Sequence, residues 1–327
     1  MAWLRRVALI AIVVVSACDA TPSPSSKPPP GSSLGLAWRT LAAAPSERTE
    51  VAATAAGKKI YVMGGYRADG GTVATVEVFD TVVGGWSRGP DLPVPVNHAM
   101  AATLGDTVYV FGGYDGGGRA FTGAFRLAGD AWQSVAQMPE PRTAATAAVV
   151  GGSVYIAGGI GAGGALTNTM LIFDGGSGRW STVAGPPTPR EHLGGAGFGG
   201  RVYTVGGRTS AGNLAALEVF DPATGRWSTL PPMPTPRGGM AAAATCFGLI
   251  VAVGGEAAAT FPQVEAFDVR TGAWQALPPL PTPRHGLGVV TVQAMLYALS
   301  GGPKPGLHIA ATAEAIDLSA LGPCPST

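Results

Sequence analysis

Short apolar segments recur six times along the chain, and each one ends in a pair of glycines. Successive pairs lie 46 to 48 residues apart, and they are Gly64-Gly65, Gly112-Gly113, Gly158-Gly159, Gly206-Gly207, Gly254-Gly255 and Gly301-Gly302. Six of the seven tryptophans repeat with nearly the same spacing, and they are Trp38, Trp86, Trp132, Trp180, Trp227 and Trp274. A period in this range, with several short strands per unit, is typical of β-propellers. The pattern therefore predicts six repeated units of β structure.

The fourth unit illustrates the strands that the pattern predicts. Gly194–Gly197 leads into an inner strand, Arg201–Val205 forms the second strand and Leu217–Asp221 forms the third. The third strand ends in Asp and the turn after it closes at Gly225, which favours a tight turn. Trp227–Leu230 then forms the outer strand. Four short antiparallel strands of this kind make one propeller blade.

The unit resembles the repeat of kelch β-propellers, which carries a Gly-Gly pair, an aromatic residue in its third strand and a spaced tryptophan. The first unit has all three features, in Gly64-Gly65, in the strand Val76–Asp80 and in Trp86. The second unit departs from the pattern, because its third strand, Phe125–Ala128, lacks the Glu and Asp that strands such as Val76–Asp80 carry. The resemblance covers residues 36–318 and implies an all-β, six-bladed β-propeller with four antiparallel strands per blade.

The two ends of this region complement each other. Trp38–Leu41 has the sequence of an outer strand, but no other strand of its unit precedes it. The last unit has three strands and no tryptophan strand after them. We therefore expect the N-terminal strand to complete the last blade, which leaves no open sheet edge at the junction. Residues 319–327 would form a C-terminal tail.

The first residues have the features of an export signal. Two arginines precede the short apolar run Val7–Val15, and Ser16-Ala17-Cys18 follows it. This resembles the lipobox of bacterial lipoproteins, in which the cysteine becomes the lipid-modified N-terminus. The alternative is an ordinary secretory signal that is cleaved after Ala17. We expect residues 1–17 to be a signal peptide, and Cys18 with a Pro/Ser-rich tether to occupy residues 18–35.

This assignment predicts an exported protein, lipid-anchored to the cell membrane and facing the extracytoplasmic side. Charged residues are only 13% of the chain and the formal net charge is +1. No basic stripe is present, so we expect no nucleic-acid partner. Contact with the membrane would be through the N-terminal lipid alone, and we expect a monomer.

Two more cysteines, Cys246 and Cys324, remain in the region after the tether. Cys246 is expected to end the inner strand of the fifth unit, and Cys324 lies in the tail. Both are expected at the same end of the propeller, and an even pair in an exported protein favours a disulfide. Two unpaired thiols are the alternative.

Candidate binding residues gather on one face, here called the upper face, where the second strands end and the crossovers between blades begin. An arginine marks the start of the inner strand in five of the six units, and the five are Arg48, Arg142, Arg190, Arg237 and Arg284. Guanidinium groups around one mouth would suit a carboxylate or phosphate ligand. Because the residue repeats, a structural role is the competing interpretation.

The other candidates on the upper face do not repeat, and they are His98, Glu191, His192, His285, Tyr66 and Tyr114. His285 is one residue out of register with the other two histidines, so its side chain is expected to point the other way. We therefore expect no three-histidine metal site, no cofactor and no assigned catalytic residue.

We expect a recognition module that binds a protein or glycan through its upper face, rather than an enzyme. The alternative is an acidic-sugar mutarotase or epimerase like the sialate mutarotases, an exported bacterial kelch family. An arginine-rich mouth would then hold the sugar carboxylate, and Glu191 or a histidine would carry the proton. A copper enzyme like galactose oxidase would need a cysteine on the upper face, and the mature sequence offers none there.

Overall fold

The structure of the protein is a computed structural model that describes residues 35–324. The expected signal peptide 1–17, Cys18 and nearly all of the tether lie outside the described residues, as do residues 325–327. Among the residues that are described, no helix has the length and apolar character needed to cross a bilayer.

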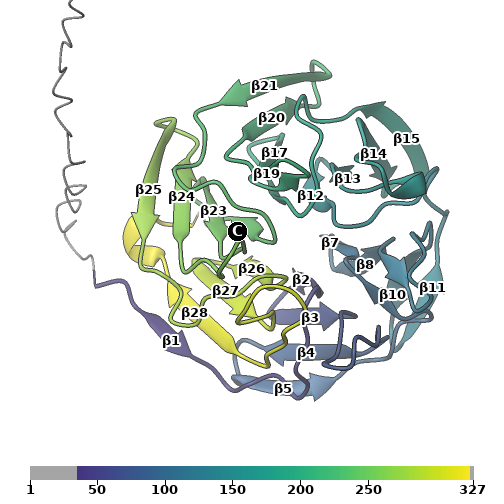
Figure 1. The fold of residues 1–327 in the computed structure, drawn as a ribbon, viewed down its shortest axis with the longest axis horizontal. Helices are drawn as coiled ribbons and strands as arrows, with labels where there is room; N and C mark the ends of the chain where they lie inside the picture. The colour runs from purple at the N-terminus through teal and green to yellow at the C-terminus, as the bar shows by residue number, and fades with distance from the viewer. Residues whose placement is uncertain (1–34, 325–327) are drawn as a thin grey trace, which may run out of the picture. The chain divides into compact units, whose positions relative to one another are not determined.

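Six four-stranded antiparallel sheets surround a central channel as the blades of a propeller (Figure 1). Blade 1 contains β2 (Ala52–Ala56), β3 (Lys59–Met63), β4 (Val76–Asp80) and β5 (Gly85–Arg88). Blade 2 contains β7 (Met100–Leu104), β8 (Thr107–Phe111), β10 (Ala124–Ala128) and β11 (Ala131–Ser134). Blade 3 contains β12 (Thr146–Val150), β13 (Ser153–Ala157), β14 (Thr169–Asp174) and β15 (Arg179–Ala184). The predicted all-β class is confirmed.

The remaining blades follow the same order from the channel outward. Blade 4 contains β16 (Gly194–Phe198), β17 (Arg201–Val205), β20 (Leu217–Asp221) and β21 (Arg226–Leu230). Blade 5 contains β22 (Ala241–Ala244), β23 (Leu249–Val253), β24 (Val264–Asp268) and β25 (Ala273–Leu277). Blade 6 contains β26 (Gly288–Val292), β27 (Met295–Leu299), β28 (Ala313–Asp317) and β1 (Trp38–Thr40).

Small elements decorate the loops. Two short ribbons pair β6 (Val96–Asn97) with β9 (Tyr114–Asp115) and β18 (Arg208–Thr209) with β19 (Gly212–Asn213). Two 3-10 turns are η1 (Ala162–Gly164) and η2 (Ser319–Leu321). The ribbons β6–β9 and β18–β19 stand on the upper face, where they extend the loops of blades 1, 2 and 4.

The first strand closes the ring as predicted. β1 pairs antiparallel with β28, with Trp38 opposite Ile316 and Thr40 opposite Glu314. Figure 1 shows the N-terminal strand lying at the outer edge of the last blade, beside β28. The indole nitrogen of Trp38 donates to the carbonyl of Pro278 in blade 5 at 2.8 Å. Strand pairing and this side-chain bond both join the two ends of the chain, so the prediction of a completed last blade is confirmed.

Every repeated tryptophan makes the equivalent bond to the preceding blade. The indole Nε1 donates to a backbone carbonyl at 2.8 to 3.0 Å, and the acceptors are Pro278, Ala42, Pro90, Ala136, Ala184 and Pro231. In most blades the tryptophan ring also packs against the aromatic residue of the third strand. The ring centroids of Trp86 and Phe79, for example, are 5.2 Å apart. Each tryptophan therefore links two blades through a polar tip and an apolar face.

The glycine pairs fit close backbone contacts between blades. Gly64 has a φ of +63°, and a Cβ there would collide with the carbonyl oxygen of Val96. In blade 6 the structural pair is offset by one residue from the predicted one. Ser300 has a φ of 56° and Gly301 a φ of 98°, whereas Gly302 is not in the left-handed region. The predicted pair was therefore wrong by one residue. Gly302 is a glycine for a different reason, because a Cβ at this position would collide with the ring of His285.

Small side chains line the central channel. The six inner strands β2, β7, β12, β16, β22 and β26 face it mainly with Ala, Gly and Thr, and they enclose about 380 Å³. Such residues let six strands approach a common axis closely. The channel walls are therefore nearly featureless, and chemistry is concentrated at the upper end, where these strands begin.

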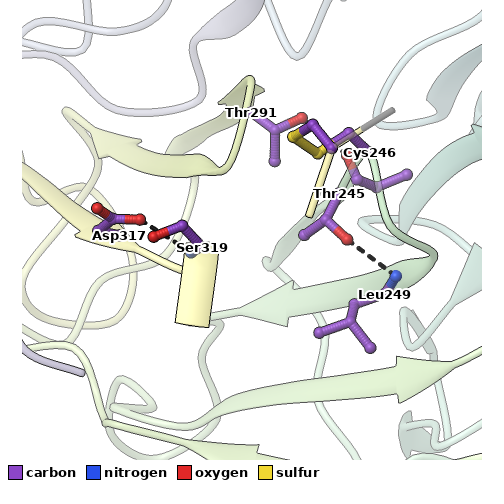
Figure 2. The surroundings of a disulfide bond; sticks show 8 residues. Thr245, Cys246, Leu249, Thr291, Asp317 and Ser319 are labelled. Carbon is purple, nitrogen blue, oxygen red and sulfur yellow. Dashed lines mark hydrogen bonds between the residues drawn. A yellow bond between two sulfur atoms is a disulfide. The ribbon is translucent and has the colours of Figure 1, made fainter. Parts of the chain in front are cut away.

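A disulfide joins Cys246 to Cys324 with their Cα atoms 5.1 Å apart. Cys246 follows β22, at the end of that strand far from the upper face, and Cys324 belongs to the tail after η2. Figure 2 shows the bond beside Thr245, whose hydroxyl accepts a hydrogen bond from the amide of Leu249 at 2.9 Å. The bridge ties the segment that follows blade 6 to blade 5, near the junction of the chain ends.

Candidate functional site

The five repeated arginines lie inside the blades, not at the mouth of the channel. Each is at most 1% exposed, and they are Arg48, Arg142, Arg190, Arg237 and Arg284. Arg190 shows the arrangement: its guanidinium donates to the carbonyls of Gly206 at 2.6 Å and Thr204 at 3.2 Å, and to Glu218 at 2.6 Å. No guanidinium face remains for a ligand. The anion-site interpretation of these residues is corrected, and the structural interpretation fits.

A glutamate neutralises each arginine, and it is buried in every pair except that of Arg142, whose partner Glu140 is partly exposed. Four of these glutamates lie in the third strand of the same blade, and the pairs are Arg48–Glu77, Arg190–Glu218, Arg237–Glu265 and Arg284–Glu314. The fifth, Glu140, lies in the crossover just before Arg142. Blade 2 lacks both partners, because Val96 and Phe125 occupy the equivalent positions and both are buried. A buried ion pair whose role is structural can be replaced as a whole by apolar residues. Val96 and Phe125 in blade 2 are such a replacement.

A closed ring of backbone hydrogen bonds surrounds the upper mouth of the channel. Its members lie two residues after the arginine position of each blade, and this mouth ring consists of Glu50, His98, Ala144, His192, Gly239 and Gly286. All six have a positive φ, between 49° and 68°. The amide of each successive member donates to the carbonyl of the one before it at 2.8 to 3.1 Å, and the amide of Val51 closes the ring on Gly286 at 3.3 Å.

Three side chains of the mouth ring converge over the channel. The Nε2 atoms of His98 and His192 lie 3.0 Å apart. The Oε2 atom of Glu50 lies 3.3 Å from the first of these nitrogens and 4.0 Å from the second. Glu50 reaches this point by passing over Gly286, where a Cβ would meet its carboxylate. All three side chains are about nine-tenths buried, with 10 to 12% of their surface exposed.

A second layer of polar groups fixes the orientation of these three side chains. The Nδ1 atom of His98 contacts Oδ1 of Asn97 at 2.6 Å, and Nδ1 of His192 contacts the carboxylate of Glu191. The other oxygen of Glu50 faces Nδ1 of His285 at 3.2 Å. Each converging group is therefore held from behind by a partner on its own blade or on a neighbouring one.

Arg208 completes the cluster. Its guanidinium bonds Glu191 and Glu256 at 2.8 Å each, so it spans from blade 4 to blade 5. Glu256 also lies 3.6 Å from Nδ1 of His285 and accepts the amide of Gly306 at 3.0 Å. We call the whole set the mouth cluster, and it consists of Glu50, Asn97, His98, Glu191, His192, Arg208, Glu256 and His285.

Two tyrosines flank the mouth cluster. The rings of Tyr66 and Tyr114 each meet the imidazole of His98 edge-on, with centroids 5.8 Å apart. Both lie on the first residue after their glycine pair, where the upper loops of blades 1 and 2 begin. They provide a half-exposed aromatic rim beside a polar centre, an arrangement that suits ligand contact.

The charges in this cluster are strongly coupled. Burial would raise the pKa of the Glu50 carboxyl, but the imidazoles of His98, His285 and His192 hold it well below its usual range. Burial lowers the pKa of His98 to about 4, so that imidazole is neutral at pH 7. The Glu191 carboxyl is also desolvated, yet His192 and Arg208 lower its pKa to about 2. Both carboxylates are therefore charged at neutral pH.

The structure brings together most of the non-repeating candidates from the sequence. His98, Glu191, His192 and His285 share the cluster, with both tyrosines beside it. His285 does point differently from the other two histidines, and the third place in the converging set belongs to Glu50. Four members of the mouth cluster were not among the candidates from the sequence, and they are Glu50, Asn97, Arg208 and Glu256. Glu50 could have been found by aligning the residue two positions after each repeated arginine.

The sequence matches the KLHDC2/KLHL20/DRC7 Kelch-repeats domain over residues 50–185 and 132–302. A kelch-like protein of Aspergillus terreus, terF, is 32% identical over 108 residues, which cover 32% of this chain and only 23% of that protein. A solved structure described as that of YjhT superposes with a TM-score of 0.72 and 16% identity, covering 84% of this chain and 95% of the other. That likeness concerns the fold. Because the domain match spans most of the propeller, the chain belongs to the kelch-repeat family.

Proposed function

We propose that this protein is a lipid-anchored extracytoplasmic binding module whose upper face captures a protein or glycan ligand over the channel mouth. The observation that carries the proposal is the mouth cluster. The fold does not require it, because Ala144, Gly239 and Gly286 fill the same ring positions in the other three blades. A kelch propeller is a rigid scaffold on which such non-repeating residues and loops can be displayed.

The cost of placing large side chains in the mouth ring supports a function for them. Glu50, His98 and His192 adopt φ values of 51° to 53°, a conformation that glycine adopts most easily. Holding a non-glycine residue there costs about 1 kcal/mol or more. Burying their polar atoms adds a further desolvation cost. Residues that lower stability in this way are expected where they serve binding or chemistry.

The acidic-sugar mutarotase alternative has lost the observation that motivated it. It relied on a mouth rich in free arginines, and all five repeated arginines are buried and paired. Arg208 lies at the mouth, but two carboxylates already engage its guanidinium. With Glu50, Glu191 and Glu256 around it, the mouth favours ligands with hydroxyl, amide or cationic donors over carboxylates.

Site-specific photocrosslinking on intact cells tests the binding role. A crosslinker in place of Tyr114 would sit on the rim, and one in place of Val83 serves as control, since that residue is 81% exposed in a turn of the opposite face. We expect discrete adducts from position 114 and none of the same mass from position 83. A glycan array probed with the full chain covers carbohydrate ligands. Equal adducts from both positions, or no adduct and no glycan signal, would contradict the proposal.

The anchor is tested separately. Cells grown with a labelled fatty acid should label the wild-type protein but not Cys18→Ser, and the variant should lose its association with the membrane fraction. Labelling that survives in Cys18→Ser would rule out this lipid site without bearing on the mouth cluster.

A further inference from the structure

The three atoms that converge over the channel have the spacing of metal ligands. Nε2 of His98, Nε2 of His192 and Oε2 of Glu50 are separated by 3.0, 3.3 and 4.0 Å. Bonds of about 2.0 to 2.1 Å in a tetrahedral zinc site place neighbouring ligand atoms about 3.3 Å apart. A single ion equidistant from the three atoms therefore requires shifts of only a few tenths of an ångström.

The protonation pattern of the two imidazoles leaves this point in need of a positive charge. The Nδ2 group of Asn97 donates to Thr72 at 2.8 Å, so its Oδ1 faces His98 as an acceptor and places the proton of that imidazole on Nδ1. Glu191 does the same for His192. Both Nε2 atoms then carry lone pairs, and these lone pairs face each other at 3.0 Å with a carboxylate beside them. A cation between them removes the repulsion.

The second layer also has the form found around metal-binding histidines. Such histidines donate their other ring nitrogen to a carboxylate or carbonyl, which fixes the tautomer and the direction of the lone pair. Asn97 and Glu191 accept in this way from Nδ1 of His98 and Nδ1 of His192. The carboxylate of Glu50 is oriented differently, because its second oxygen faces Nδ1 of His285 as an acceptor. Asn97 is 1% exposed and His285 is 2% exposed, so these partners are firmly packed.

The other half of the mouth ring supplies no donor side chain. Ala144, Gly239 and Gly286 occupy the other three ring positions. An ion held by Glu50, His98 and His192 therefore keeps a coordination position directed to the channel or to solvent. Three protein ligands with an open position are typical of zinc sites that bind an exogenous molecule. Two imidazoles and one carboxylate suit first-row divalent metals, with zinc the ion least dependent on a particular geometry.

We propose that Glu50, His98 and His192 bind one zinc-class divalent metal ion at the upper mouth of the propeller, with a coordination position left open for a ligand oxygen or nitrogen. This assignment goes beyond the proposed binding role, because the ion would bind whether or not a protein or glycan reaches the face. It also replaces the expectation of a metal-free site, which rested on three histidines and did not consider Glu50.

Titration of the purified full chain with Zn²⁺ alone tests the site. After removal of metals with a chelator, we expect one equivalent to bind, measured by calorimetry or by competition with a chromophoric chelator. His98→Ala and His192→Ala should each weaken binding more than about a hundredfold, and Glu191→Gln about 10- to 100-fold through loss of orientation. His308→Ala is the matched control, since that exposed histidine lies in a loop of the same face and its loss should change nothing.

Substitution with Co²⁺ gives an independent readout, because its visible absorption reports a low coordination number with nitrogen and oxygen ligands. Circular dichroism must show that each variant is folded, and Glu50→Gln offers a near-isosteric variant should the alanine variants unfold. Failure of the folded wild-type chain to bind stoichiometric Zn²⁺ would overturn the proposal and point to a shared proton between the imidazoles. Binding that survives in the His98→Ala and His192→Ala variants but disappears in His308→Ala would overturn it equally. Neither result bears on the crosslinking test of ligand capture.

Discussion

Two sets of charged residues lie at the same end of the blades and have opposite roles. Arg190 and His192 are separated by one residue in the chain, yet the first is enclosed within blade 4 and the second faces the channel mouth. The arginine and its glutamate partner recur in five blades, and blade 2 replaces both with apolar residues. Glu50, His98 and His192 appear in three blades only. Repetition marks the residues that build the blades, and its interruption marks the candidate site.

The physical difference lies in where each set finds its partners. The terminal guanidinium nitrogens of an arginine of the first set bond to carbonyls and a carboxylate of its own blade, so one blade is sufficient. The converging groups of the mouth cluster come from blades 1, 2 and 4, and blades 5 and 6 also contribute to the second layer. The cluster therefore exists only when the ring is closed, and it can change without altering any single blade.

The largest expected effect comes from breaking one buried pair. Arg190→Ala leaves Glu218 buried without its counter-charge and removes the guanidinium donors to the carbonyls of Thr188, Thr204 and Gly206. This should lower the free energy of unfolding by about 3 to 5 kcal/mol. Urea denaturation followed by tryptophan fluorescence measures this. The double variant Arg190→Met with Glu218→Leu removes both charges and should lose much less. A loss below about 1 kcal/mol in the single variant would show that the pair is not structural.

The glycine pairs belong to the same repeated scaffold and allow a matched comparison. Gly64→Ala introduces a methyl group against the carbonyl of Val96, whereas Gly57→Ala at a similar φ of +57° meets nothing within 4 Å. Both carry the strain of a left-handed alanine, about 1 kcal/mol. We expect Gly64→Ala to lose about 3 kcal/mol and Gly57→Ala about 1 kcal/mol in thermal or urea unfolding. Equal losses would mean that backbone conformation, not blade contact, selects glycine there.

The disulfide tests the end of the propeller opposite the mouth cluster. Replacing Cys246 and Cys324 by Ser together should lower stability by about 2 to 3 kcal/mol, because the tail is no longer tied to blade 5. Wild-type protein in reductant should melt at the same temperature as the double variant. Neither treatment should change Zn²⁺ affinity, and a change would show that the lower end and the mouth are coupled.

The smallest effect on stability is expected at the mouth itself. His192→Gly in metal-free protein removes a left-handed non-glycine residue and the close approach of two nitrogens, while it also loses packing. We expect the free energy of unfolding to stay within about 1 kcal/mol of wild type. The measurement compares the losses in free energy of unfolding of His192→Gly and Arg190→Ala under identical urea conditions. A loss as large as that of Arg190→Ala would assign the mouth cluster to the scaffold.

The fold could be predicted from the sequence because each blade repeats local requirements. The glycine pairs and the Asp-to-Gly turns each require a particular backbone conformation, and each spaced tryptophan supplies a large apolar surface. All of these requirements recur within one repeat of about 50 residues. The error in blade 6 shows the limit of this approach. Gly301-Gly302 matches the pattern in letters, but Ser300 tolerates the left-handed position and Gly302 makes room for His285.

The site was only partly predictable. His98, Glu191, His192 and the two tyrosines were identified as non-repeating residues of the upper face, which is correct as to location. The arginines were placed on the same face, but the sequence does not reveal whether a side chain turns inward or outward at the start of a strand. Burial of Arg190 depends on Glu218, which lies 28 residues later in the chain.

The sequence by itself determined the number of blades, the order of their strands and the closure of the ring by Trp38–Leu41, because these follow from local periodicity and chain continuity. Only the tertiary structure decided which polar residues meet. Glu50, His98 and His192 are more than 40 residues apart in sequence and are brought within 4.0 Å by closing six blades around one axis. Contacts of that kind depend on the curvature of the whole ring, which no single repeat encodes.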